Sequence, residues 1–211
     1  MKRTFTTIGF LLAAGVLFWF FPLFHVVPAT GEWGSERIAE FDAAKFAKSF
    51  WAKRLVPAFN QAANAASVLA AFEENYPEAR EQYGRSAGLG RAAIYLVGGT
   101  GTIVAVDERG VGIAVRGGGN EPEVLLQTGL VSGNAVRDAT GLISASDYPS
   151  SQEFNAISIQ LNRIVEESVI PSLKEKAKVG GKVTFVGCGR VLNLPVDVKP
   201  LKIVPLEVRF E

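Results

Sequence analysis

Histidine and cysteine are almost absent from this sequence of 211 residues. The one histidine, His25, lies inside an apolar run near the N-terminus, so residues 31–211 contain no histidine at all. A histidine-containing zinc site and a Ser-His-Asp triad are therefore excluded from that part of the chain. The one cysteine, Cys188, cannot form a disulfide within a single chain. We interpret it as a small packed residue in a strand rather than as a partner in an interchain disulfide.

Charge is absent from residues 4–30, and the stretch from Ile8 to Val27 offers about 20 mainly apolar positions, enough to cross a bilayer as a helix. Lys2 and Arg3 precede this run directly, and the positive-inside rule then keeps the N-terminus in the cytoplasm. We therefore expect a single N-terminal anchor in the inner membrane, with the rest of the chain in the periplasm.

A cleaved signal peptide is the alternative for residues 1–30. Residues 27–29, Val-Pro-Ala, have the small-residue character of a cleavage site. The apolar run is, however, longer than the apolar region of a usual signal peptide, which has roughly 7 to 15 residues. Under either interpretation, we expect the chain from about residue 31 onward to work outside the cytoplasm.

The exported part carries almost no net charge. Lys2 and Arg3 account for two of the 22 basic residues, which leaves 20 against 21 acidic ones. This balance gives no general attraction to nucleic acid or anionic lipid. The glycine-rich run 98–102 lacks the lysine of a P-loop and the spacing of a dinucleotide fingerprint, so we interpret it as a bulge or barrel corner. We expect no nucleic acid, cofactor or metal ion.

Residues 31–90 are expected to form a helical segment. Phe46 and Phe50 recur at helical spacing with small alanines, and Pro57 interrupts or kinks the helix. An alanine-rich stretch over residues 58–74 continues the pattern, since alanine favours the helix and allows close approach of a neighbour. The segment is predicted to be a helical hairpin or a bent helix between the membrane and the domain.

Residues 91–211 consist of short apolar runs separated by glycine-rich turns, a pattern typical of a small barrel. Ser150 and Glu153 form a capping box that begins a helix over residues 151–170, and alternating strand patterns resume after it up to residue 210. This order is typical of an OB-type barrel, in which the helix between the third and fourth strands plugs one barrel end. We therefore predict an α+β, mainly β fold: an OB-like small barrel with an N-terminal helical hairpin.

A series of short motifs in a defined order resembles an uncharacterised family of predicted bacterial periplasmic lipoproteins, many of which are encoded beside sugar ABC-transporter genes. The resemblance covers nearly the whole exported part, and it implies an OB-like barrel with an added helical segment and no established activity. The motifs that carry it are Phe41-Asp42, Trp51, Leu55-Val56-Pro57, Ala79, Tyr83-Gly84, Gly99, Gly101, the run 133–138 (Gly-Asn-Ala-Val-Arg-Asp), the run 152–155 (Gln-Glu-Phe-Asn) and Leu161-Asn162.

The sequence departs from that family in one respect. Residues 23–28 stand where such members place a lipidated cysteine, and none is present there. This departure favours a protein anchor rather than a lipid.

The richest group of polar residues lies on both sides of the helix start. Arginine and amide side chains there could bind a polyol, a carboxylate or the backbone of a partner. In the structural alternative, Arg137 clamps the loop onto the helix through Glu153 or backbone carbonyls, and the asparagines hold the loop ends. If residues 133–138 are extended, Arg137 and Asp138 face opposite sides and need not pair. The candidate site residues are Asn134, Arg137, Asp138, Gln152, Asn155 and Asn162.

We therefore expect a non-enzymatic, membrane-anchored periplasmic binding module. The family resemblance further implies an accessory role in sugar uptake, with a component of an ABC transporter as the partner. One alternative is a glycan-acting enzyme, which needs two carboxylates across a cleft. Another is single-strand nucleic-acid binding, which OB barrels often perform. Near-neutral charge and few aromatic residues on the predicted strands disfavour the latter.

Overall fold

The computed structural model describes residues 41–86, 92–117, 119–192, 194 and 196–211. The predicted anchor or signal segment, residues 1–30, lies outside these ranges, as does the boundary predicted near residue 90. Residues Phe41–Glu211 form one compact unit. Within the described ranges, no helix combines the length and the apolar character needed to cross a membrane.

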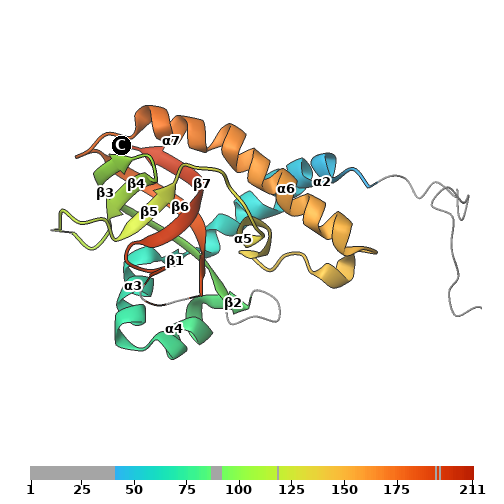
Figure 1. The fold of residues 1–211 in the computed structure, drawn as a ribbon, viewed down its shortest axis with the longest axis horizontal. Coiled ribbons are helices and arrows are strands. Elements are labelled where there is room, and N and C mark those ends of the chain that lie inside the picture. Colours follow the sequence, from blue (N-terminus) through green and yellow to red (C-terminus); the bar gives the residue numbers. More distant parts are fainter. Residues whose placement is uncertain (1–40, 87–91, 118, 193, 195) are drawn as a thin grey trace, which may run out of the picture. The chain divides into compact units, whose positions relative to one another are not determined.

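The centre of the domain is a closed barrel of mainly antiparallel strands (Figure 1). Its hydrogen-bonded order is β3-β4-β5-β7-β6, and β6 pairs again with β3 to close the ring. The pairing of β5 with β7 is parallel. This order confirms the predicted OB-like barrel. The strands are β3 (Ala93–Asp107), β4 (Gly110–Ala114), β5 (Val124–Gln127), β6 (Lys182–Val191) and β7 (Leu201–Phe210).

Strand β3 closes the barrel because it pairs with two neighbours along its length. Residues 93–102 pair with β6, and residues 102–107 pair with β4, with a bulge between Ile103 and Ala105. Gly101 lies at the change of partner, where a Cβ atom would be 2.4 Å from the carbonyl oxygen of Ala114. The glycine-rich run is therefore a barrel corner, as its sequence indicates.

The chain before the barrel is helical and bent. Helix α2 (Ala43–Phe50) continues through a π-helical turn (Trp51–Leu55) and a 3₁₀ segment (Val56–Gln61) that contains Pro57. Helices α3 (Ala65–Glu74) and α4 (Tyr76–Tyr83) follow, with the short strands β1 (Ala63–Asn64) and β2 (Gly84–Ser86) pairing with β3. The predicted bent helical segment is present, and α3 buries Val68 and Phe72 in the barrel core.

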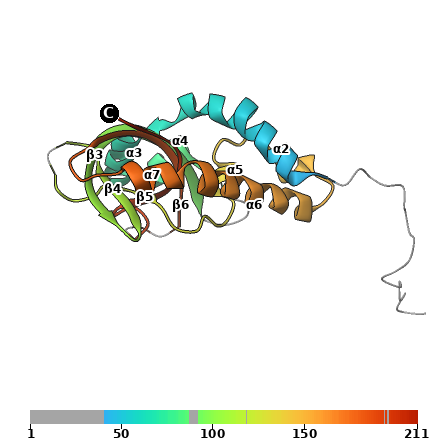
Figure 2. The same ribbon diagram turned by 90° about the horizontal axis from the view of Figure 1, so that it is seen from above.

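Helix α6 (Ser151–Ser168) begins at the Ser150 cap, whose hydroxyl accepts the Glu153 N–H at 3.2 Å. A second helix, α7 (Ile170–Lys176), follows directly and buries Leu173 among the barrel's core residues. The plug of the barrel end is therefore α7, because α6 instead extends outward and packs against α2 (Figure 2). Helices α2 and α6 enclose a second core that includes Phe50, Leu161 and the buried Cys188 of β6.

The barrel corner yields a stability prediction. We expect Gly101→Ala to lower the free energy of unfolding by about 1–3 kcal/mol, because the added methyl group collides with the Ala114 carbonyl. Denaturant unfolding of the full-length chain measures the change. Gly129→Ala is the matched control, since no atom lies within 4 Å of the position its Cβ would take. Equal effects of the two substitutions would contradict the steric role of Gly101.

Candidate binding site

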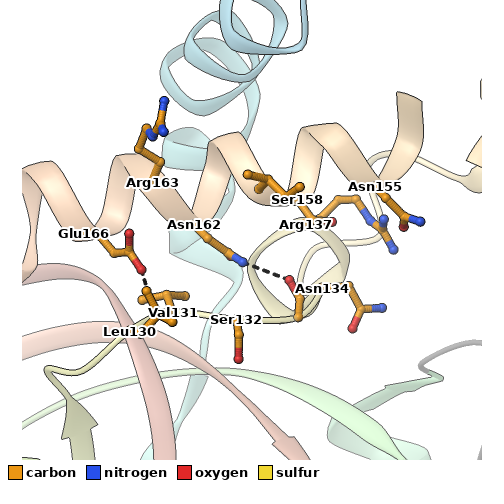
Figure 3. Close-up of a pocket in the computed structure, with 12 residues that line it drawn as sticks. Leu130, Val131, Ser132, Asn134, Arg137, Asn155, Ser158, Asn162, Arg163 and Glu166 are labelled. Atoms are coloured by element: carbon orange, nitrogen blue, oxygen red, sulfur yellow. Dashed lines mark hydrogen bonds between the residues drawn. The ribbon is translucent and has the colours of Figure 1, made fainter. Parts of the chain in front are cut away.

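The segment after β5 lies along helix α6 and is bonded to it at two points (Figure 3). The Asn162 Nδ2 donates to the carbonyl oxygen of Gly133 at 2.9 Å. One turn further along the helix, a Glu166 carboxylate oxygen accepts the N–H of Val131 at 2.7 Å. These bonds satisfy buried or half-buried backbone groups and hold residues 130–134 against the helix.

Arg137 makes the third attachment, and it is only 5% exposed. Its Nη1 donates to the carbonyl oxygen of Phe154 at 3.1 Å, and its guanidinium carbon lies 3.5 Å from the centre of the Phe154 ring. The clamp onto α6 thus uses a backbone carbonyl. Because the guanidinium also stacks on the ring, its position is fixed by a planar surface as well as by hydrogen bonds.

Arg137 and Asp138 form an ion pair and do not face opposite sides, as they would in an extended segment. The Nε and Nη2 of Arg137 donate to the two carboxylate oxygens of Asp138 at 2.6 and 3.0 Å. The physical reason is that these residues belong to a helical turn, α5 (Ala135–Asp138), rather than to an extended segment. Asn134 also donates its amide to Asp138. Asp138 therefore neutralises the buried guanidinium.

A groove with a volume of about 530 Å³ opens between α6 and residues 130–134. Of the predicted site residues, Asn134, Arg137, Asn155 and Asn162 line it (Figure 3). Asp138 lies in an adjoining cavity that Asn134 and Arg137 share. Gln152 is exposed and lines neither space. The fold therefore brings together the predicted cluster except for Gln152.

Two side-chain atoms beside the groove have no hydrogen-bond partner in the part of the chain that the structure describes. They are Ser158 Oγ and Asn162 Oδ1, and both residues are only 6% exposed. Both residues line the groove. Sequence reasoning missed Ser158, although Asn155, Ser158 and Asn162 are spaced by three and four residues and so share one face of a helix. That spacing was the available signal.

The groove is flanked by exposed aliphatic side chains. Leu130 is 87% exposed and Ile159 is 62% exposed, and both line the groove. Arg163 points away from the loop (Figure 3). The groove thus combines buried hydrogen-bonding groups with apolar surface, which is the usual composition of a binding site.

Acidic groups suited to catalysis do not gather here. Glu166 is the one carboxylate lining the groove, and Asp138 is the one lining the adjoining cavity. Each already accepts hydrogen bonds, from Val131 and from Arg137 respectively.

Nearby, burial raises the pKa of Tyr148, and the negative charge of Asp147 raises it further. Within the described part of the chain, no three His, Cys, Asp or Glu side chains gather as a metal site.

Comparison with known proteins gives one family and one solved structure. The family described as "Predicted periplasmic lipoprotein (DUF2291)" matches residues 14–209. The crystal structure of an OB-fold protein from Thermotoga maritima superposes with a TM-score of 0.73 at 27% identity, covering 81% of this chain and 99% of that chain. No curated protein sequence matches.

The buried arginine yields a second prediction. We expect Arg137→Met to lower the free energy of unfolding by about 3 kcal/mol, because Asp138 and the Phe154 carbonyl lose their buried cationic partner. Thermal and denaturant unfolding measure the loss, and the double variant Arg137→Met, Asp138→Asn should recover part of it. Arg109→Met, which breaks the exposed Arg109–Asp107 pair, is the control and should change stability little. Similar losses in both single variants would contradict the clamp.

Proposed function

As a member of the family of predicted periplasmic lipoproteins, the chain works outside the cytoplasm, and we propose that it is a non-enzymatic binding module. Its site is the groove between α6 and residues 130–134. Its proposed partner is a protein of solute uptake, such as a component of a sugar ABC transporter, the class to which the family resemblance in the sequence points.

One observation carries this proposal: Ser158 Oγ and Asn162 Oδ1 are buried beside the groove without hydrogen-bond partners among the described residues. Leaving such a group unpaired costs about 1–3 kcal/mol, so a bound molecule that pairs with it gains a corresponding advantage. An amide oxygen such as Asn162 Oδ1 accepts only, and therefore it selects a ligand that presents an N–H or O–H donor. The three attachments to α6 preorganise the groove, and this lowers the entropy cost of binding.

The apolar flanks of the groove favour a polypeptide partner. Leu130 and Ile159 line the groove together with the hydrogen-bonding groups, and both are largely exposed. A polypeptide segment provides both backbone N–H donors and aliphatic side chains to cover such residues. Because Asp138 already neutralises Arg137, a carboxylate ligand gains less here than an uncharged one.

The mode of anchoring is part of the proposal. The only cysteine is Cys188, which is buried in β6, so residues 1–40 offer no cysteine for a lipid. We therefore assign anchoring in the inner membrane to the apolar run of residues 4–30, retained as a helix.

The alternative of a glycan-acting enzyme receives no support from the site. That chemistry requires two carboxyl groups on opposite sides of the scissile bond. Glu166 and Asp138 line different cavities, and each is engaged in holding the segment that contains the site.

Partner capture tests the proposal at the exposed flank. We expect Ile159→Ser to reduce, by several-fold, the recovery of a specific partner crosslinked to the full-length protein in native membranes. Val179→Ser is the matched control, because Val179 is 66% exposed and Ile159 is 62% exposed, but Val179 does not line the groove. Thermal unfolding should be unchanged in both variants, since neither side chain is buried. If capture is equal for the two variants, the groove is not the partner site.

A further inference from the structure

Four residues from adjacent strands form a row on the outer wall of the barrel. Ala105 of β3 is opposite Gly112 of β4, Gly112 is opposite Leu125 of β5, and Leu125 is opposite Lys202 of β7. Gly112, Leu125 and Lys202 are next in the chain to residues of the barrel core. These core neighbours include Val111, Ile113, Leu126 and Ile203. Because strand side chains alternate, the row faces outward.

This row is hollow because its first two positions carry little or no side chain. The resulting cavity has a volume of about 360 Å³, with Pro122 and Pro200 among the residues that line it. Gly112 is required at this place, since a Cβ atom there would lie 2.7 Å from the Cβ of Pro122. The volume falls at the lower end of the range of small-molecule sites, roughly 300–1,000 Å³.

The row ends in the positive charge of Lys202. Lys202 is a half-buried residue, and its ammonium forms no ion pair with the described residues. Arg109 and Asp107 also line the cavity, and they are paired with each other at 2.7 Å. Among the described residues that line the cavity, Lys202 is therefore the one cation that forms no ion pair with a carboxylate.

We propose that this cavity binds a small organic anion with a short aliphatic part. The anionic group pairs with Lys202, and the hydrocarbon part covers Gly112 and Leu125. This site lies apart from the groove on α6, and the proposal does not depend on the function assigned to that groove.

The lining of the cavity indicates a small ligand rather than a polymer. OB barrels that bind oligonucleotides or oligosaccharides use the wall of their second and third strands, here β4 and β5. Single-strand binding on such walls relies on aromatic side chains that stack with successive bases. None of the described residues that line this cavity is aromatic, and Pro122 is part of the lining. The same wall is therefore suited to one small molecule.

Hexanoate and hexan-1-ol, which share a chain but differ in charge, provide the test. In an amide NMR titration of the full-length chain, we expect saturable shifts at Gly112, Leu125 and Lys202 with hexanoate. Hexan-1-ol should bind at least about threefold more weakly, the range expected for one partly exposed ion pair.

Three variants complete the experiment. Lys202→Met should reduce hexanoate binding to the level of hexan-1-ol, and Ala105→Leu should abolish binding of both by filling the cavity. Lys174→Met removes an exposed lysine of α7 and should leave binding unchanged. Thermal unfolding of each variant verifies the fold, and Ala105→Leu and Lys202→Met replace side chains that face outward. Equal binding of the two probes, or the absence of saturable binding at Gly112 and Lys202, overturns the proposal.

Discussion

Barrel closure through β3 is the constraint on which the rest of the structure depends. A single strand pairs with β6 over its first part and with β4 over its second, so it must bend sharply without losing its hydrogen bonds. Gly101 permits this because the backbone of Ala114 occupies the space that a side chain would need. Once the ring is closed, one core lies inside it, and β3, β6 and β7 present a second apolar surface outside. Helices α2 and α6 cover that surface.

The position of α6 on the second core creates the groove. One face of α6 is buried against α2 and the barrel, and a neighbouring face carries Asn155, Ser158 and Asn162 toward the segment after β5. That segment has little secondary structure of its own beyond α5, and its bonds to Asn162, Glu166 and the Phe154 carbonyl give it a defined position. Polar contacts attach the segment to α6, whereas the flanks of the groove are apolar. The segment is therefore held in place while Leu130 stays exposed for contact with a partner.

The two proposed sites arise from different parts of one architecture. The groove is built from a helix and a bonded loop, and it is flanked by aliphatic side chains suited to a polypeptide. The cavity on the outer wall results from strand register, which aligns Ala105, Gly112, Leu125 and Lys202. A module with both sites can hold a small anion on one wall and a partner on another. Their tests share no residue, so each proposal stands or fails separately.

Much of the fold follows from local features of the sequence. Glycine-rich turns, the capping box at Ser150 and the order of strand and helix patterns predicted the OB-like barrel, because each depends on residues close together in the chain. The bend at Pro57 and the burial of Cys188 could be predicted for the same reason. The periodicity also predicted a helix over residues 151–170, but it could not show that α7 rather than α6 fills the barrel end. That choice depends on where the chain turns at residues 168–170.

The tertiary structure alone decided the pairing of Arg137 with Asp138, the stacking on Phe154, and the unpartnered atoms of Ser158 and Asn162. Each depends on a distance between segments that are remote in sequence, or on whether four residues form a turn or a strand. The row that ends at Lys202 could be recognised only from the register of the strands. That register is fixed when the sheet closes, so local sequence patterns do not show it. The sequence by itself determined an exported, nearly neutral OB-like domain without histidine chemistry, since these properties depend on composition and local pattern. Where its polar groups meet was decided by barrel closure, which brings distant strands and helices into contact.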